Sequence, residues 1–399
     1  MYIKRALEKS FKASSIKYPI LLLEGAKGTG KTSFLKKLNK NKRNYVSLEP
    51  LDIRQLAWED PELFLCKYQS PLIIDEIQLA PNLIKYIAEK ANKDKDFSCW
   101  ISASQSFSIK KELTLLNNKL KTFTLYPLSN KEINKINSEP FIPNNINTAN
   151  IPEKNPQEIF KQIWLGSFPE VVIKKNKTEF YQNYVQNYIE KEIYEIAQIG
   201  DKSRFFAFMK AVAARSAKML NYAELAEEAC ISQPTAKSYL KILEISGLIK
   251  LIYPYKTISS APMVSTPKVY MTDTGLMSYL TSWNNPEALA DGAESKSFFE
   301  TKYVSEIIKS FTNSGLEPEL YYYRDRTTSP KEISLIIKNN DIIYPVEFKK
   351  SITVNSEASK NFEKVKTFKT PIGTGAIICL AKEYSELNKG VKVIPAYMI

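Results

Sequence analysis

The sequence predicts an α/β protein in which a parallel sheet is followed by a helical segment and then by a second, smaller α/β segment. Three observations favour this. Apolar runs at 20–23, 72–74, 97–102 and 123–125 are separated by helical stretches, a pattern typical of a parallel sheet with helices on both faces. Residues 159–215 have mostly helical periodicity. A helix at 298–311 then precedes short strands at 320–323, 333–337, 344–348 and 376–380.

Composition indicates a globular protein with more than one core. The chain has 399 residues, of which 44% are hydrophobic and 25% charged, enough for two or three domains. No apolar run reaches the length of a membrane span, and the first ten residues are too charged for the core of a signal peptide. We therefore expect a cytoplasmic protein that does not contact a membrane.

The absence of histidine limits the chemistry that the chain can perform. It excludes His-based triads and His metal ligands. The four cysteines lie far apart and form no CxxC pair, so we expect neither a disulfide framework nor a zinc site. Any catalysis must therefore use carboxylates, lysines and a bound metal.

The net charge of +13 is concentrated near the N-terminus. Residues 1–45 hold 12 Lys and Arg against 2 Asp and Glu, which accounts for +10 of the total. Such a cluster is usually a solvated face, although a nucleic-acid or partner surface stays open. The total charge alone is therefore no argument for DNA binding.

Composition and periodicity divide the chain into four parts. We expect a P-loop domain over 1–135 and a loop or linker rich in Asn and Pro over 136–158. A helical segment with a helix-turn-helix follows over 159–290, and the second α/β segment occupies 291–399.

A phosphate-binding loop follows the first strand. The sequence fits GxxxxGK[ST] between a strand and a helix, where its glycines free successive backbone N–H groups to surround phosphates. Lys31 would meet the β- and γ-phosphates, and the Thr32 hydroxyl would ligate Mg²⁺. The sequence thus predicts that ATP and Mg²⁺ bind at Gly25, Ala26, Lys27, Gly28, Thr29, Gly30, Lys31 and Thr32.

Acidic and polar residues end the next two strands. Asp75 would complete the Mg²⁺ site, and Glu76 would orient or deprotonate the attacking water, so that Glu76 and Lys31 are the predicted catalytic residues. Ser104 and Gln105 are predicted to sense the γ-phosphate. The alternative, in which Asp75 and Glu76 only begin a solvated turn, stays open.

These residues resemble a known family, the bacterial and archaeal AAA-type ATP-binding proteins that join a P-loop domain, a winged helix and a C-terminal domain of unknown function. The resemblance spans nearly the whole chain. It is carried by the segments 25–32, 73–78, 104–106, 126–129, 166–170 and 266–276.

The resemblance implies a restriction-endonuclease-like fold, PD-(D/E)XK, for the C-terminal domain. The implied metal-site residues are Glu300 on a helix, Glu332 before a strand, and Glu347 and Lys349 in an ExK signature, two apart on one strand face. Ser334 stands where the family usually has a metal-binding Asp, and a hydroxyl is a poor substitute. We therefore expect a degenerate domain with a binding or scaffolding role rather than an active nuclease.

A helix-turn-helix is predicted over 222–248, with Ser232 as the N-cap of its second helix. Lys237 and Lys241 lie four apart on that helix and would share a face that could contact DNA. Residues 221–256 contain as many acidic as basic residues, which weakens the electrostatic case, and a protein-packing role stays open.

The sequence leaves three functions to weigh. The first is an ATPase that acts as a switch or motor and rearranges its other domains. The second is a nucleotide-regulated DNA-binding or DNA-processing protein of a defence or mobile-element system. The third is a scaffold that holds ATP without turnover. A protein partner and a homo-oligomer are compatible with each of them.

Overall fold

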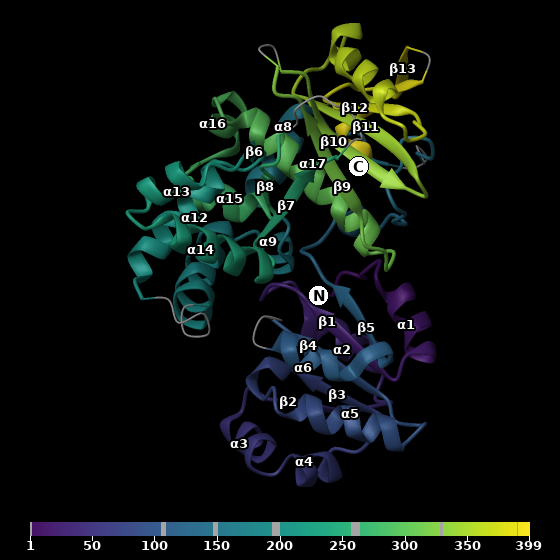
Figure 1. The fold of residues 1–399 in the computed structure, drawn as a ribbon, viewed down its shortest axis with the longest axis vertical. Coiled ribbons are helices and arrows are strands. Elements are labelled where there is room, and N and C mark those ends of the chain that lie inside the picture. The colour runs from purple at the N-terminus through teal and green to yellow at the C-terminus, as the bar shows by residue number, and fades with distance from the viewer. Residues whose placement is uncertain are drawn as a thin grey trace.

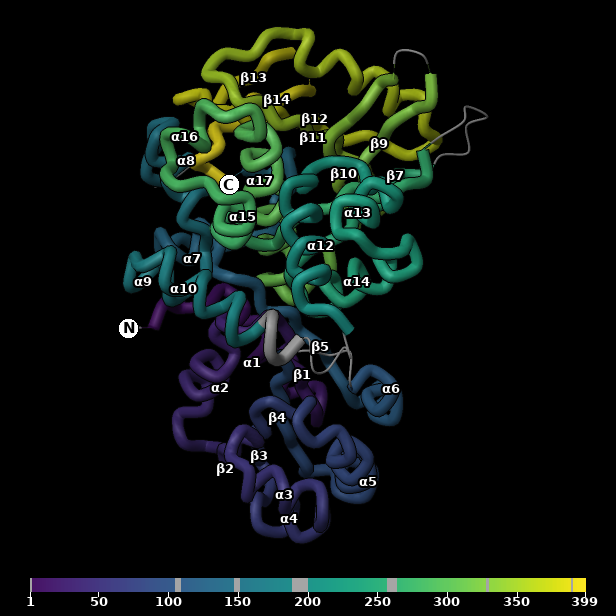
Figure 2. Tube along the Cα trace, turned by 90° about the vertical axis from the view of Figure 1, so that its left-hand side faces the viewer, coloured from purple at the N-terminus to yellow at the C-terminus, as the bar shows by residue number. Residues whose placement is uncertain are grey.

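The computed structural model describes residues 2–104, 109–146, 151–193, 200–256, 264–327, 330–388 and 390–399. A smaller N-terminal part, purple to blue in Figure 1, is joined to a larger part that contains the rest of the chain. The first residues lie near the junction between the two parts, and α7 (Asn130–Ile133) also lies there in the turned view of Figure 2.

Within the described residues, five parallel strands form the sheet of the N-terminal part. Their spatial order is β2 (Asn44–Ser47), β3 (Leu72–Asp75), β4 (Cys99–Ala103), β1 (Ile20–Glu24) and β5 (Leu120–Thr124). The predicted parallel sheet is confirmed. The sequence did not indicate β2, and β5 begins three residues before the expected strand.

Both faces of this sheet are buried, as successive side chains of a strand point to opposite sides. Leu21 and Leu23 pack with side chains of α1 (Glu8–Lys17) and α2 (Lys31–Asn39). Ile20 and Leu22 belong to the core on the other face. The helices there are α3 (Leu51–Glu59), α4 (Pro61–Lys67) and α5 (Leu83–Lys93).

Nine strands of the described part of the chain form a second, mixed sheet. In spatial order they are β13 (Ser385–Asn388), β14 (Val391–Pro395), β12 (Gly375–Cys379), β11 (Ile342–Lys349), β10 (Glu332–Asn339), β9 (Glu319–Arg324), β7 (Ile249–Pro254), β8 (Lys268–Met271) and β6 (Lys218–Met219). Because β7 pairs in parallel with β9, the sheet continues across the predicted boundary at residue 290.

Helix α17 (Ser295–Thr312) is the central helix of the larger part, and nearly all of its residues are buried. Other helices of this part share the same core. They are α8 (Pro156–Leu165), α9 (Pro169–Lys174), α10 (Lys177–Asn183), the π-helical continuation η4 (Tyr184–Ile193), α12 (Lys202–Ala214), α15 (Thr274–Leu280) and α16 (Pro286–Asp291).

The two helices of the predicted helix-turn-helix are present as α13 (Tyr222–Glu228) and α14 (Gln233–Ile245). The Ser232 hydroxyl accepts a hydrogen bond from the Thr235 N–H at 3.2 Å, so the predicted N-cap is confirmed. By contrast, only 136–146 and 151–155 of the predicted linker are described as irregular, and α8 begins at Pro156 within its expected range. The linker is not exposed throughout, since Phe141 is buried and its N–H donates to Ser310 Oγ.

None of the described helices combines the length and the apolar composition needed to cross a lipid bilayer.

Candidate nucleotide-binding site

The loop between β1 and α2 has a backbone that only glycine adopts readily. Gly25, Gly28 and Gly30 have φ angles of 152°, 80° and 95°. A Cβ atom on Gly25 would lie 2.3 Å from the Leu125 carbonyl oxygen. The glycines therefore permit both the turn of the loop and its close packing on the strand end.

The Lys31 ammonium group is buried at the centre of this loop. It donates to the carbonyl oxygens of Gly25 at 2.9 Å and Ala26 at 3.3 Å, and to Ser104 Oγ at 2.8 Å. The loop thus holds a cation against the end of β4, where a phosphate group would be neutralised.

Asp75 lies beside Thr32 at the carboxyl end of β3. The Thr32 hydroxyl donates to Asp75 Oδ2 at 2.7 Å, and Tyr45 donates to the same oxygen at 2.7 Å. Ser102 on β4 donates to Asp75 Oδ1. Three hydroxyl groups therefore fix the orientation of this carboxylate.

The oxygen atoms of Thr32 and Asp75 suit a magnesium ion, which prefers hard oxygen ligands. Among the described residues, no group of three or more His, Cys, Asp or Glu side chains is placed to hold a metal ion. A site with one carboxylate and one hydroxyl still fits Mg²⁺, because nucleotide phosphates and water supply most of its ligands in such proteins.

Glu76 directly follows β3 and has a φ angle of 61°, in the left-handed region that non-glycine residues seldom adopt. Its N–H donates to Ser102 Oγ at 3.0 Å. Its carboxylate accepts from Ser104 Oγ at 2.8 Å and lies 4.0 Å from Lys31 Nζ. Ser104 thus joins the loop lysine to Glu76.

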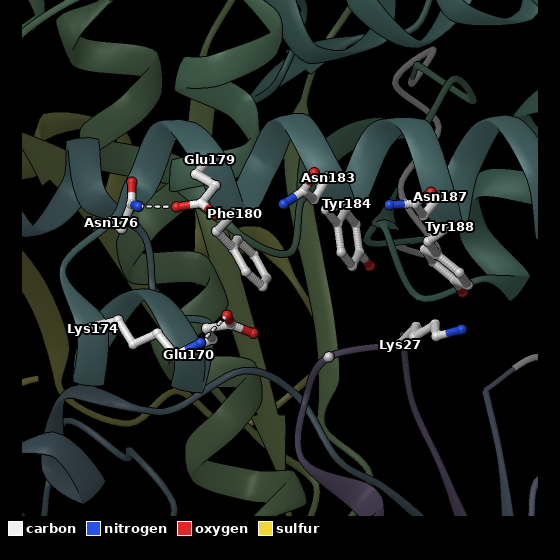
Figure 3. A pocket seen from close by; sticks show the side chains of 11 residues that line it. Lys27, Glu170, Lys174, Asn176, Glu179, Phe180, Asn183, Tyr184, Asn187 and Tyr188 are labelled. Atoms are coloured by element: carbon white, nitrogen blue, oxygen red, sulfur yellow. Dashed lines mark hydrogen bonds and ion pairs between the residues drawn. The ribbon is translucent and has the colours of Figure 1, made fainter.

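The larger part of the molecule covers the outside of the loop. Gly28 faces the rings of Phe168 and Tyr184, and the Tyr188 hydroxyl donates to the Ser104 carbonyl oxygen at 3.3 Å. In Figure 3 the rings of Phe180, Tyr184 and Tyr188 point from α10 and η4 toward the loop that carries Lys27, and these residues line a pocket of about 290 Å³. The surroundings of the loop therefore come from both parts of the chain.

A second charged group lies in the C-terminal part, where β8, β10, β11 and α17 meet. The Lys268 ammonium lies 2.6 Å from Glu332 and 3.4 Å from Glu300. The Tyr270 hydroxyl donates to Glu300 at 2.8 Å. Burial lowers the pKa of Lys268, but the two carboxylates outweigh burial and raise it above its usual value, so the side chain stays charged.

Glu347 lies in the same region and is satisfied without a metal. It accepts hydrogen bonds from the Ser334 N–H at 3.0 Å and the Ser334 hydroxyl at 2.9 Å. Burial raises its pKa to about 7, while Lys349, two residues further, is only half-buried. The Lys268 ammonium group already neutralises Glu300 and Glu332, and the Ser334 hydroxyl stands in place of a metal-binding carboxylate. A divalent metal ion therefore does not fit here.

Family models match three consecutive segments of the chain. Residues 17–134 match a family described as an AAA domain. The other two matches, over 156–287 and 295–399, are to families described only as domains of unknown function. Together with the loop geometry, the first match decides the type of the N-terminal part.

Residues 17–134 form an AAA-like P-loop domain.

Two relatives and two solved structures are also similar to parts of the chain. Uncharacterized proteins of Mycobacterium tuberculosis and Mycobacterium bovis are each 22% identical to the chain over 363 residues, covering 88% of this chain and 73% of the relative. A Walker-type ATPase of Pyrococcus abyssi is 13% identical, with a TM-score of 0.45, over 70% of this chain and 96% of that one.

The Aeropyrum pernix ORC1 protein, solved in complex with DNA, is 12% identical with a TM-score of 0.29, over 71% of this chain and 93% of that one. Both scores are below 0.5, so the family match and the site geometry carry the assignment of the AAA-like domain. The matches to the later segments name no fold. The winged-helix domain and the restriction-endonuclease-like fold therefore stay predictions.

The structure brings together five of the residues predicted for the nucleotide site, Lys31, Thr32, Asp75, Glu76 and Ser104. Gln105 lies outside the described residues. Sequence reasoning missed the contributions of Tyr45 and Ser102 to the Asp75 environment. Tyr45 belongs to β2, which has four residues and no apolar run. The strand order, with β2 beside β3, is the feature that brings its hydroxyl to Asp75.

Proposed function

We propose that the chain is a Mg²⁺-dependent ATPase in which hydrolysis changes how the AAA-like domain and the larger part are arranged. The observation that supports this most is the meeting of Lys31, Asp75 and Glu76 at the carboxyl ends of three neighbouring strands. Ligands bind at this edge of parallel α/β sheets. All three side chains are joined by direct hydrogen bonds to Ser102 or Ser104.

In this proposal the loop N–H groups and Lys31 bind the phosphates of ATP. Thr32 and Asp75 hold the magnesium ion, which would neutralise charge on the phosphate oxygens when it is bound. On nucleotide binding, Lys31 exchanges its contacts with Gly25 and Ala26 for phosphate oxygens. The positive charge of Lys31, which the carbonyl oxygens of the loop contact in this structure, then neutralises the phosphates of ATP.

Glu76 is the proposed base. Its carboxylate is only partly buried, and it is held by Ser104 at the end of β4 next to the loop lysine. A carboxylate in this place can accept a proton from water or orient it for attack on the terminal phosphate. Ser104 contacts both Lys31 and Glu76, so we propose that it responds to the presence of that phosphate.

Steady-state phosphate release and equilibrium binding of ATP together test this function. Lys31→Ala should lose both, because the buried cation of the loop is removed. Glu76→Gln should bind ATP within about threefold of the native chain but hydrolyse it at least about a hundredfold more slowly, the size of a general-base contribution. Lys37→Ala, on the exposed side of α2, is the matched control and should behave as the native chain.

If the native chain binds ATP tightly but releases no phosphate, the proposed ATPase activity is contradicted. The scaffold that holds ATP without turnover is then favoured.

A role in DNA binding is the second candidate, and one observation favours it. Lys237 and Lys241 are both exposed on α14, the second helix of the helix-turn-helix. Duplex DNA should then bind in a salt-dependent manner, and the pair Lys237→Glu and Lys241→Glu should abolish it. If this variant binds duplex DNA as tightly as the native chain does, α14 is not the DNA-binding surface.

Nuclease activity is not part of the proposal, because Lys268 and Ser334 satisfy the carboxylates that a metal would need. Incubating plasmid DNA with Mg²⁺ or Mn²⁺ should give no cleavage. Cleavage that Glu347→Ala abolishes would contradict this.

A further inference from the structure

One buried side chain, Arg5, fixes the outer side of the phosphate-binding loop. Its Nη1 donates to the Thr29 carbonyl oxygen at 2.9 Å and its Nη2 to the Tyr126 carbonyl oxygen at 2.6 Å. The Thr29 carbonyl and the Gly30 N–H belong to one planar trans peptide and therefore point in opposite directions. By binding the carbonyl, Arg5 fixes the orientation of this peptide and therefore of the Gly30 N–H, one of the N–H groups with which such a loop binds phosphates.

Arg5 is in turn bound to the turn that contains α7. Its Nε lies 2.9 Å from Glu132 Oε1, and this buried ion pair is 3% and 1% exposed on its two sides. Glu132 Oε2 accepts the Ser129 N–H at 2.8 Å, which closes the N-terminal cap of α7. The position of this turn and the orientation of the loop peptide are therefore set by the same guanidinium group.

The other side of the same turn is bound to α17. The Asn130 N–H, the first of α7, donates to Glu306 Oε2 at 2.8 Å. Glu306 Oε1 pairs with Lys302 at 2.8 Å and with Lys309 at 3.1 Å, and Lys309 also donates to the Leu128 carbonyl oxygen at 3.1 Å. A charged, fully buried group of α17 thus contacts the backbone of the turn at two points.

From these contacts we propose that Arg5 is a positioning residue for phosphate binding, and that the turn 126–133 couples the nucleotide state of the loop to helix α17. The turn is the element that both sides contact, because Arg5 binds Tyr126 and Glu132 while Glu306 accepts the Asn130 N–H. A change of the Thr29–Gly30 peptide on phosphate binding moves Arg5, and the α7 turn carries this to Glu306 and Lys309. Helix α17 also bears Glu300, so the coupling reaches the charged group that Glu300 forms with Lys268 and Glu332.

This inference rests on the proposed function, because it assumes that the loop binds a nucleotide. Coupling between two sites is reciprocal. If nucleotide binding changes the stability of the contact between the turn and α17 by some factor, loss of that contact must change the affinity for the nucleotide by the same factor. That reciprocity gives a test that needs no knowledge of what α17 does.

The test uses two substitutions of Asn130 in the full-length chain. Asn130→Pro removes the N–H that donates to Glu306, and proline is well tolerated at the first residue of a helix. Asn130→Ala removes the same side chain but keeps the N–H. The difference in ATP affinity between these two variants therefore measures the backbone contact with Glu306 rather than the side chain.

We expect Asn130→Pro to bind MgATP about fivefold more weakly than Asn130→Ala, the lower range of measured coupling between sites. Arg5→Lys should weaken binding about tenfold or more, because charged hydrogen bonds to the loop and the turn are lost. In the Arg5→Lys background the difference between Asn130→Pro and Asn130→Ala should disappear, as the path to the loop is already broken. Thermal unfolding of each variant shows that it is folded.

Equal affinity of Asn130→Pro and Asn130→Ala overturns the coupling, and so does a difference that persists unchanged in Arg5→Lys. If Arg5→Lys does not fold, the comparison of the two Asn130 variants in the native background decides alone. A second readout is hydrogen exchange of α17 amides, which MgATP should slow in Asn130→Ala but not in Asn130→Pro. Failure of the native chain to bind ATP at all would instead contradict the proposed function.

Discussion

At the scale of single residues, Asp75 illustrates how hydrogen bonds orient a side chain of the candidate nucleotide site. Hydroxyl groups from Thr32, Tyr45 and Ser102 all donate to it. Hydrogen bonds to a charged acceptor are stronger than those between neutral groups, and partners behind a metal ligand fix its orientation. Burial and the bond to Asp75 raise the pKa of Tyr45, so this hydroxyl keeps its proton and remains a donor.

Tyr45→Phe should weaken the response of ATP hydrolysis to Mg²⁺. Loss of a partner behind a metal ligand typically costs about tenfold or more in metal affinity, so the Mg²⁺ concentration for half-maximal rate should rise about tenfold. A titration of Mg²⁺ at fixed ATP measures this. Tyr86→Phe, on α5 of the same domain, is the control. An unchanged Mg²⁺ requirement would show that Tyr45 has only a packing role.

Lys268 should be essential to stability because it neutralises the buried carboxylate of Glu300. Lys268→Met leaves the buried Glu300 without its cation, while Glu332 keeps its ion pair with Arg324, and breaking a buried pair in this way costs about 3–5 kcal/mol. Urea unfolding at pH 7 measures the loss, with Lys250→Met on the exposed face of neighbouring β7 as the control. The further change Glu300→Gln should recover part of it.

The same variant tests whether the ammonium group takes the place of a metal. Mn²⁺ should stabilise Lys268→Met against urea but leave the nucleotide-free native chain unaffected, because Glu300 loses its ammonium partner only in the variant. Equal stabilisation of both by Mn²⁺ would contradict the conclusion that a divalent ion does not fit beside Lys268.

At the scale of elements, α17 is unusual in that it is buried along nearly its whole length and yet carries charged residues. Glu306 is fully enclosed. Burial alone raises its pKa, but Lys302, Lys309 and the Asn130 N–H outweigh burial and lower the pKa to about 2. The helix is therefore held in the core by paired charges as well as by apolar packing.

The lowered pKa of Glu306 predicts how stability depends on acid. Since this pKa is lower in the folded chain than in the unfolded chain, ionised Glu306 stabilises the fold above about pH 4.5, and the contribution is lost as the pH falls toward 2. Glu306→Gln should cost about 3 kcal/mol at pH 7 and progressively less below pH 4.5. Urea unfolding between pH 7 and pH 3 measures this, and a deficit independent of pH would contradict it.

Glu347 provides a comparison of opposite sign on β11. Burial raises its pKa to about 7, so the folded chain holds this proton more tightly than the unfolded chain and loses stability as the pH rises from about 4.5 to 7. Glu347→Gln removes that loss. The stability of the variant relative to the native chain should therefore improve on going from pH 5 to pH 8. A relative stability that is the same at both pH values would show that Glu347 does not titrate there.

At the scale of the whole molecule, local patterns were enough to locate the phosphate-binding loop, its flanking elements and the most apolar strands. The apolar runs that became β1, β3 and β4, and those that became β9 to β12, are visible because buried strands are continuously apolar. The loop from Gly25 to Thr32 is a motif, and Ser232 is a typical N-cap. Such features are determined by neighbours in the chain.

Features that depend on pairing between distant segments were not predictable. β2 is short and half exposed, and nothing in its composition marks it. The parallel pairing of Tyr253 with Tyr321, which joins two predicted segments in one sheet, has no local signal. Arg5 pairs with Glu132, 127 positions away, and Lys268 pairs with Glu300, 32 positions away. Their roles are therefore visible only in the folded chain.

The central claim, that Glu76 makes the nucleotide-binding loop an ATPase, is tested most directly by single-turnover phosphate release from ATP already bound to the protein. With MgATP at less than the protein concentration, the native chain should release phosphate in a single phase. Glu76→Gln, with the same ATP bound, should release it at least about a hundredfold more slowly. Equal rates in the two proteins, or no release by the native chain, would contradict the account.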